Sequence, residues 1–572
     1  MKYSLAVRTR LLSAFFIAIA LLLIVRLYFV QIVHGKEYQT DAVAQYVDQV
    51  SDALRRGTIY FTTRDNELVA AAVMQTGWKV AIDPKEIVSA TSTFNALNAI
   101  TPIDQVRFMQ SAGKSNDPYE EVAFQLSDDV ADQIRAKKLP GVILVADQWR
   151  TYPAHEVGSN VVGFVGYQGD TKVGMSGLER SYQETLSQGP ATLYVNPFAE
   201  IFTNIGSLLS FDPASHEGSV VTSIEPKVQQ QLETTLDDVM KEYTPEFAGG
   251  IVMDPRTGEI YAIGDRPSFD PNIYNLVTDN SVFGNKLVEG RYELGSIMKP
   301  LTMAAGIDSH AITPETTYND TGCILVSTYK VCNYDLKARG VIPMQQILSQ
   351  SLNVGASFVA THTGYPAFTA YMKAYGFQSK TGVDLPNEVS GDLSPLGDGQ
   401  GPAVNYDTAS FGQGISVSPI EMIRALSALA NQGMLPNPHV VTGIKFDSGI
   451  TRSVPVAAGT QVLRPETASA VTEMLIKVFD TGLLNGKLKQ DHYTIAAKTG
   501  TAQISKTGGG YYADGTYLHS FFGYFPARDP RFIIFLFAFK PHGQEYASAT
   551  LAHPFMDIAQ FLINYYNIPP DR

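Results

Sequence analysis

The feature that most constrains this chain is a serine–lysine pair at the start of a predicted helix. Within Tyr292–Pro300, Ser296 and Lys299 stand three residues apart, and the mostly apolar residues 301–307 favour a helix. The proline falls in the first turn, where a missing N–H costs little. At this spacing the two side chains share one helix face, so the lysine amine lies beside the hydroxyl.

This pair has the chemistry of a nucleophile and its base. A serine hydroxyl attacks poorly until a base takes its proton, and a lysine desolvated in a pocket can be that base. A helix that begins at Ser296 also directs free backbone N–H groups toward a substrate oxyanion. Two other Ser-x-x-Lys tetrapeptides, Ser111–Lys114 and Ser327–Lys330, do not open an apolar helix. The alternative for Ser296 is a capping serine beside a solvated lysine.

The composition argues against several classes of function. A length of 572 residues predicts two to four domains. The net charge of −13 argues against nucleic acid as a partner, because a phosphate backbone needs a basic face. No His-Glu-x-x-His or Gly-x-x-x-x-Gly-Lys-Ser/Thr motif occurs, so we expect neither a metal nor a cofactor. Cys323 and Cys332 form either a local disulfide in an oxidising compartment or two separate thiols.

The amino-terminal segment predicts a membrane anchor. Residues 11–33 form an apolar run that, as a helix, would span about 35 Å and cross a bilayer. Three basic residues precede it, so the positive-inside rule places residues 1–10 in the cytoplasm and the remaining chain outside. The competing interpretation, a cleaved signal peptide, lacks a small-x-small site, because Arg26–Phe29 follow the apolar core.

The rest of the chain is predicted to form two α+β domains. Residues 34–218 alternate short strand and helix patterns without a catalytic constellation, which indicates a spacer domain. Residues 219–572 contain a predicted hairpin at 249–263, and helices around a mainly antiparallel sheet make an α+β domain. Helices are expected at 226–243, 343–361, 365–375, 418–432, 465–480 and 547–566, and strands at 493–503, 518–526 and 531–540.

A second motif supplies a hydroxyl and an amide. Ser351 and Asn353 lie on a predicted helical stretch, 345–358, whose turn could present both groups together. Ser351 could relay a proton between Lys299 and a leaving amine. Asn353 could hydrogen-bond the lysine and the substrate backbone. The alternative is that both residues only close a helix turn.

A third motif, Lys498–Thr501, ends a predicted strand. Lys498, Thr499 and Thr501 place an ammonium and two hydroxyls where a substrate carboxylate can dock, and Gly500 would let a substrate backbone approach closely. The N–H of Thr501 would join that of Ser296 as an oxyanion donor, a contact worth about 10²–10³ in rate. Two other Lys-Thr-Gly sequences lie in loops or glycine-rich turns.

The three motifs, in this order, resemble the penicillin-interacting serine acyl-transferases. The chain is similar to the class B penicillin-binding proteins, which are peptidoglycan D,D-transpeptidases, and most of all to the division-associated type. The resemblance runs from the anchor to residue 566, and Leu294 departs from it where the family usually has proline. Other matching segments are Arg56-Gly-Thr-Ile, Thr63-Arg-Asp-Asn66, Arg150-Thr-Tyr-Pro153, Gly177-Leu-Glu179, Met253–Glu259, Phe411-Gly-Gln-Gly414 and Asn431-Gln-Gly433.

The resemblance implies a fold and a reaction. The fold is a penicillin-binding-protein and serine β-lactamase-like domain, an antiparallel sheet flanked by helices, preceded by an elongated α+β pedestal of the dimerisation type at 34–218. Ser296 would attack the penultimate D-alanyl carbonyl of a stem peptide, with Lys299 as general base. Ser351 with Lys498 would pass the proton to the leaving D-alanine. Thr499 and Thr501 would hold the terminal carboxylate. An amine from a neighbouring stem would then complete the cross-link, and β-lactams would acylate the same serine.

The resemblance also implies partners and a location. It implies peptidoglycan stem peptides, β-lactams, the lipid bilayer, a membrane glycosyltransferase and other division proteins as partners, with the catalytic domain outside the bacterial cytoplasmic membrane. Three alternatives remain: a D,D-carboxypeptidase, a membrane-anchored β-lactam sensor, and a non-catalytic scaffold of the wall-synthesis complex. The apolar Leu352, where serine β-lactamases usually have aspartate, favours a wall enzyme over a hydrolase.

Overall fold

The computed structural model describes residues 55–572 except 115, 170, 188–192, 195–216, 447, 507–509 and 512–514, together with residues 19, 26, 47 and 48. Apart from residues 19 and 26, the expected anchor at 11–33 lies outside this part of the chain. Among the described residues, no helix combines the length and apolar character needed to cross a membrane.

The chain divides into two compact units. One comprises residues 1–55, 76–149 and 188–215, and the other comprises 56–75, 150–187 and 216–572. Two stretches of the expected spacer, 56–75 and 150–187, therefore belong to the unit that holds the three motifs.

The smaller unit packs helices and strands around its own core. The end of β3 (Leu68–Ile82) pairs with β4 (Glu120–Leu126) and β5 (Val142–Thr151). α3 (Ala90–Asn98) and α4 (Gln105–Ala112) lie between β3 and β4 in the chain. α5 (Asp128–Lys137) begins after Ser127, which makes no side-chain capping bond. The core residues are Val80, Ile82, Phe94, Leu97, Phe108, Val122, Ala123, Leu126 and Ile134.

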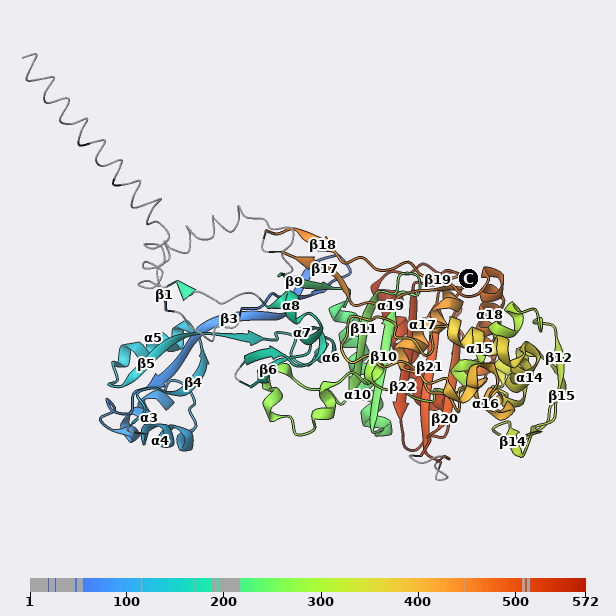
Figure 1. Cartoon of the computed structure of the whole chain (residues 1–572), viewed down its shortest axis with the longest axis horizontal. Helices are drawn as coiled ribbons and strands as arrows, with labels where there is room; N and C mark the ends of the chain where they lie inside the picture. Colours follow the sequence, from blue (N-terminus) through green and yellow to red (C-terminus); the bar gives the residue numbers. More distant parts are fainter. Residues whose placement is uncertain are drawn as a thin grey trace, which may run out of the picture. The chain divides into compact units, whose positions relative to one another are not determined.

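The larger unit contains a five-stranded antiparallel sheet in the order β11-β10-β22-β21-β20 (Figure 1). Its strands are β10 (Phe247–Met253), β11 (Ile260–Arg266), β20 (Ala496–Gln503), β21 (Tyr517–Phe525) and β22 (Phe532–Phe539). The expected hairpin and late strands are thus confirmed. β20 is an edge strand, so one side of its backbone is not paired within the sheet.

Helices cover both faces of this sheet. Side chains alternate along a strand, and on β21 His519 contacts α19 (Ala547–Tyr565) whereas Tyr524 bonds to Thr472 of α18 (Pro465–Lys477) on the opposite face. α10 (Pro226–Tyr243) packs beside α19, and α17 (Pro419–Ala430) packs beside α18. Burial on both faces explains why β22 is a continuous apolar run.

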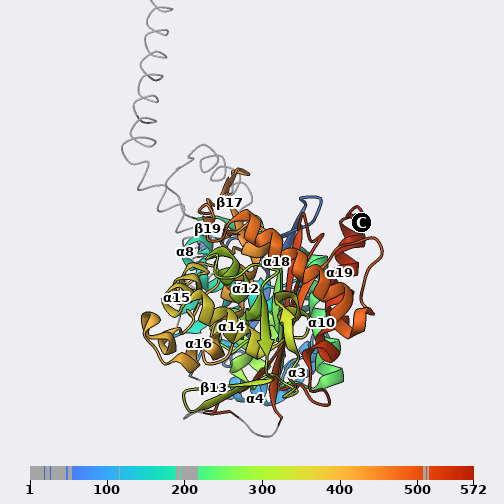
Figure 2. The ribbon, with the colours of Figure 1, turned by 90° about the vertical axis from the view of Figure 1, so that its right-hand side faces the viewer.

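A second layer of helices adjoins α18 (Figure 2). It consists of α12 (Lys299–Asp308), α13 (Met344–Ser349), α14 (Asn353–Thr363), α15 (Tyr365–Ala374) and α16 (Ala403–Ala409). In the smaller unit β1 (Val47–Asp48) pairs with β8 (Leu193–Tyr194). Short elements of the larger unit are η2 (Pro271–Leu276), η3 (Asn280–Phe283), α11 (Lys286–Glu289), β12 (Thr317–Asp320), β15 (Gly340–Pro343), η5 (Ser394–Gly399), β16 (Met434–Leu435), β19 (Thr460–Gln461), η6 (Val478–Gly482) and η7 (Leu483–Gly486).

Strands of a second sheet and a buried ion-pair cluster complete this unit. Glu179 accepts from Arg56 Nε at 2.7 Å and from Arg150 Nε at 2.6 Å, with all three side chains buried. Three sequence segments that matched the family pattern therefore meet at one carboxylate. The elements here are β2 (Ile59–Thr62), β9 (Ser219–Thr222), β17 (Val441–Lys445), β18 (Thr451–Ser453), β6 (Val165–Gln168), β7 (Thr171–Gly174), α6 (Ser159–Val162), α7 (Gly177–Ser181) and α8 (Gln183–Leu186).

Candidate active site

Ser296 lies in a tight turn that leads directly into a buried helix. The 3₁₀ turn η4 (Gly295–Met298) is followed by α12, whose first residue is Lys299. Gly295 has φ 69°, a conformation that favours glycine, and places the turn against the backbone of Thr501. Lys299 Nζ lies 2.9 Å from Ser296 Oγ. The lysine is only 1% exposed, so a buried amine lies beside the hydroxyl, and its role as a base stays a prediction.

The prediction of one continuous helix at 343–361 is wrong at its centre. α13 ends at Ser349, α14 starts at Asn353, and Ser351 between them has φ 56°, in the left-handed region. Lys299 Nζ donates to the carbonyl of Ser351 at 2.6 Å and to Asn353 Oδ1 at 2.8 Å. A non-glycine residue at positive φ is strained, and these bonds from a distant helix stabilise the turn.

Lys498 completes the group from the edge strand β20. Its Nζ lies 3.1 Å from Ser351 Oγ and donates to the carbonyl of Thr499 at 2.9 Å. Ser351 Oγ also lies 3.2 Å from Lys299 Nζ. The serine hydroxyl therefore bridges two lysines that are 199 residues apart in the chain.

Burial depresses the pKa of both lysines. Desolvation, and next the positive charge of Lys498, hold the pKa of Lys299 well below its usual value of 10.5. Desolvation lowers the pKa of Lys498 to about 7. Two adjacent ammoniums in a buried site repel each other, so burial and the charge of Lys498 both favour the neutral amine of Lys299.

Gly500 has a different neighbour from the one that its motif suggested. A Cβ at this position would lie 2.4 Å from Ser520 Oγ, 2.7 Å from the carbonyl oxygen of Leu294 and 3.1 Å from the nitrogen of Ile297. The glycine therefore allows β20 to pack closely on the serine turn, whereas the sequence suggested close approach of a substrate. Ser520 Oγ donates to the Leu294 carbonyl at 2.8 Å, which holds the turn at the position where the family usually has proline.

A cavity of about 510 Å³ opens over these groups. The predicted site residues in its wall are Ser296, Ser351, Asn353, Lys498, Thr499 and Thr501, whereas Lys299 and Gly500 do not line it. The hydroxyl of Thr501 accepts from the backbone N–H of Ala547 at 3.1 Å, so its own O–H remains able to donate toward a bound carboxylate.

The cavity wall also includes a residue that sequence reasoning did not assign to the site. Gln413 lines the cavity, and its buried Nε2 has no hydrogen-bond partner among the described residues. An unpaired buried amide is costly, which indicates a donor placed for a ligand. Its place in Phe411-Gly-Gln-Gly414, a segment that matched the family, was the available signal.

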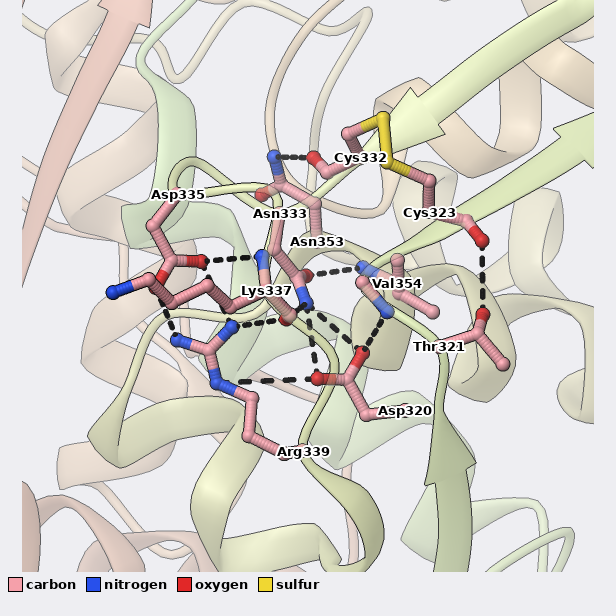
Figure 3. Close-up of a disulfide and its surroundings, with 11 residues drawn as sticks. Asp320, Thr321, Cys323, Cys332, Asn333, Asp335, Lys337, Arg339, Asn353 and Val354 are labelled. Carbon is pink, nitrogen blue, oxygen red and sulfur yellow. Dashed lines mark hydrogen bonds and ion pairs between the residues drawn. A yellow bond between two sulfur atoms is a disulfide. The ribbon is translucent and has the colours of Figure 1, made fainter.

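The two cysteines form a disulfide beside this site (Figure 3). Cys323 and Cys332 are opposite each other in the hairpin of β13 (Cys323–Val326) and β14 (Tyr329–Cys332). The carbonyl of Cys332 accepts from Asn353 Nδ2 at 3.0 Å. The alternative of two separate thiols is therefore excluded, and the hairpin contacts the second motif.

A serine turn, a Ser-x-Asn turn and a Lys-Thr-Gly edge strand around one cavity are the arrangement of a penicillin-interacting acyl-transferase. The comparisons agree with this class. Residues 248–559 match the family model of the penicillin-binding protein transpeptidase domain, and residues 51–197 match that of the penicillin-binding protein dimerisation domain. The chain belongs to the penicillin-binding protein transpeptidase family, and the two domains together make it a class B member, as the sequence motifs indicated.

Named relatives extend over nearly the whole chain. "Stage V sporulation protein D" of Bacillus subtilis (strain 168) is 28% identical, covering 96% of this chain and 84% of the relative. "Peptidoglycan D,D-transpeptidase FtsI" of Escherichia coli (strain K12) is 27% identical, covering 92% of this chain and 86% of the relative.

Solved structures share the fold. Penicillin-binding protein 2X from Streptococcus thermophilus has a TM-score of 0.71 at 22% identity, covering 91% of this chain and 81% of that chain. Penicillin-binding protein 3 from Mycobacterium tuberculosis, complexed with aztreonam, has a TM-score of 0.68 at 22% identity, covering 91% and 98% of the two chains. The predicted fold class of the two domains is therefore confirmed, whereas the transmembrane helix that it included stays a prediction.

Proposed function

We propose that this chain is a peptidoglycan D,D-transpeptidase that cross-links stem peptides through an acyl-enzyme on Ser296. The observation that carries the proposal is the hydrogen-bonded group of Ser296, Lys299, Ser351 and Lys498, which brings three distant segments together at the wall of one cavity. The family membership and a relative named as a peptidoglycan D,D-transpeptidase support the substrate class. The same relative supports a role in septal wall synthesis.

Acylation begins with the neutral amine of Lys299. Its depressed pKa leaves it able to take the proton of Ser296 Oγ at 2.9 Å while that oxygen bonds to the carbonyl carbon of the penultimate D-alanine. The carbonyl oxygen becomes an oxyanion, which the backbone N–H groups of Ser296 and Thr501 stabilise.

Departure of the terminal D-alanine needs a proton on its nitrogen as the C–N bond breaks. Ser351 Oγ lies between the two lysine amines and can donate its own proton while it accepts one from Lys498 or from protonated Lys299. Thr499 and Thr501 hold the carboxylate of the leaving residue through their hydroxyls, and the charge of Lys498 favours that anion.

The acyl-enzyme is resolved by an amine of a second stem peptide. That nitrogen attacks the ester carbonyl, passes a proton to Lys299, and displaces Ser296 Oγ, which regains a proton. An amide bond between two stems replaces the ester. A β-lactam, whose ring amide imitates the terminal dipeptide, would acylate Ser296 and remain bound there.

The proposed location is outside the cytoplasmic membrane of a bacterium, with residues 11–33 as a single-pass anchor and residues 1–10 in the cytoplasm. The disulfide of Cys323 and Cys332 supports this, because such bonds persist in oxidising compartments. A membrane glycosyltransferase and other division proteins are the proposed protein partners, since a cross-linking enzyme acts on newly polymerised glycan.

Labelling with a fluorescent penicillin tests the site. Wild type should become labelled, and Ser296→Ala and Lys299→Ala should not. Ser327→Ala is the matched control, because this exposed serine belongs to another Ser-x-x-Lys sequence. Label retained in the Ser296 variant contradicts the site assignment.

Product analysis with stem peptides tests the reaction. A cross-linked product that depends on Ser296 supports the transpeptidase. Free D-alanine without a cross-link indicates a carboxypeptidase. Acylation by penicillin without turnover of wall peptides indicates a β-lactam sensor. If Ser296→Ala still supports wall synthesis in cells, the scaffold alternative is favoured.

A further inference from the structure

A buried amide–carboxylate pair on another segment supports the second motif where it leads into α14 (Figure 3). Asn333 follows β14, and its Nδ2 donates to both carboxylate oxygens of Asp320, at the end of β12, at 2.9 and 3.1 Å. Each residue is 1% exposed. Arg339 Nε lies 3.9 Å from the same carboxylate and partly balances its charge.

Asn333 supplies the capping contact that α14 lacks. The residue before α14, Leu352, has no side chain that can cap the helix. Asn333 Oδ1 instead accepts from the backbone N–H of Val354 at 3.1 Å. The first turn of a helix leaves such N–H groups without partners, so an amide from a distant segment occupies the position of a cap.

The preceding residue of the same segment, Cys332, orients the amide of Asn353. The carbonyl of Cys332 accepts from Asn353 Nδ2 at 3.0 Å, which leaves Asn353 Oδ1 facing Lys299 Nζ at 2.8 Å. Cys332 and Asn333 therefore contact two successive residues of α14, and the disulfide to Cys323 restrains this end of the hairpin.

The turn that these contacts support is strained. Ser351 has φ 56° and is held by Lys299 from one side, whereas the hairpin contacts hold Asn353 and Val354 from the other. Strained backbone persists where surrounding contacts determine it. Loss of the hairpin contacts would let the turn relax and move Ser351 Oγ away from the two lysines.

We propose that Asn333 is a positioning residue for the reaction, with Asp320 as its anchor. This rests on the proposed function, because it assigns Asn333 the task of holding Ser351 and Asn353 in reacting geometry. The pairing needs both halves of the amide, the oxygen toward Val354 and the nitrogen toward Asp320. Leucine has neither group, and aspartate would place a second carboxylate against Asp320.

The test measures acylation by fluorescent penicillin in the full chain, separating the dissociation constant from the first-order acylation constant. Asn333→Leu and Asn333→Asp should lower the first-order constant by about ten- to a hundred-fold, the loss expected when reacting groups shift by roughly 1 Å. The exchange variant, Asn333→Asp with Asp320→Asn, restores an amide–carboxylate pair and should recover wild-type acylation to within about threefold. Asn319→Ala, an exposed neighbour on β12, should behave as wild type.

The outcomes separate the two proposals. If wild type is not labelled, or if label persists in Ser296→Ala, the proposed function is wrong. If labelling depends on Ser296 but Asn333→Leu and Asn333→Asp acylate at the wild-type rate, only the positioning role is wrong. If the exchange variant has the melting temperature of wild type but its first-order acylation constant stays low, the pairing does not position the turn, and the inference is again overturned.

Discussion

Replacement of Gly500 by alanine separates two explanations for the glycine in the Lys-Thr-Gly strand. The sequence suggested that Gly500 lets a substrate approach, whereas the structure places its open side against the serine turn. An added Cβ would lie 2.7 Å from the carbonyl oxygen of Leu294 and 3.1 Å from the nitrogen of Ile297. Favourable separations are about 3.5–4.0 Å, so β20 would have to move from the Leu294 carbonyl by roughly 0.8–1.3 Å.

The expected effect of Gly500→Ala is on both stability and chemistry. Overpacking of this kind costs about 1–3 kcal/mol of unfolding free energy. A displacement of Ser296 approaching 1 Å costs up to about a hundred-fold in rate. We therefore expect the first-order constant for acylation by a fluorescent penicillin to fall about ten- to a hundred-fold, with a lower melting temperature in the same preparation.

The control is Gly264→Ala, on β11 at the opposite edge of the same sheet. An added Cβ there meets only the Gln229 amide nitrogen at 3.2 Å and Glu233 Oε1 at 3.6 Å, both on side chains. Acylation should stay at the wild-type rate. If Gly500→Ala acylates within about twofold of wild type, the close packing of strand and turn does not matter for the chemistry. If only the dissociation constant rises, the original explanation through substrate approach is correct.

Three further predictions follow from burial. The pKa of Lys498 is about 7 in the folded chain and 10.5 when the side chain is exposed. Between about pH 7 and pH 10.5 the unfolded chain therefore binds more protons than the folded chain, so the free energy of unfolding rises with pH in this window. Denaturant titrations should show the free energy of unfolding of wild type rising, relative to that of Lys498→Met, by about 1.4 kcal/mol per pH unit from about pH 7 to about pH 9. If the two proteins depend on pH in the same way, the prediction is wrong. Glu179→Gln leaves the buried guanidiniums of Arg56 and Arg150 uncompensated and should lower the free energy of unfolding by about 3–5 kcal/mol in the same assay. The exposed Glu184→Gln should leave it unchanged, and equal denaturation midpoints for the two variants would refute the prediction. Gln413→Leu should weaken penicillin binding by about two- to ten-fold with an unchanged first-order constant, and an unchanged dissociation constant would show that its amide meets no ligand.

Many elements could be predicted from local pattern. The helix expected at 226–243 forms with the same bounds in α10, because Pro226 suits a first turn and the apolar residues that follow recur at helical spacing. The hairpin at 249–263 and the late strands also form. The anchor at 11–33 stays a prediction. Each of these elements is specified by residues close together in the chain, which is the range over which propensity and periodicity act.

The interruption of the predicted helix at 343–361 had no such local signal. Ser351 and Leu352 are compatible with a helix by propensity, but Lys299, 52 residues earlier, bonds to the carbonyl of Ser351. Asn333, Cys332 and the cavity amide of Gln413 belong to the same category, since their roles come from contacts with distant segments.

What the sequence determined by itself was the inventory of chemistry: a serine beside a lysine, a hydroxyl with an amide, and a second lysine on a strand. What only the tertiary structure decided was the protonation and the geometry of these groups. Lys299 and Lys498 have low pKa values because packing removes them from water, and Ser351 lies between them because a strained turn is held from both sides. Desolvation and convergence arise only when distant segments pack together, and no short stretch of sequence contains them.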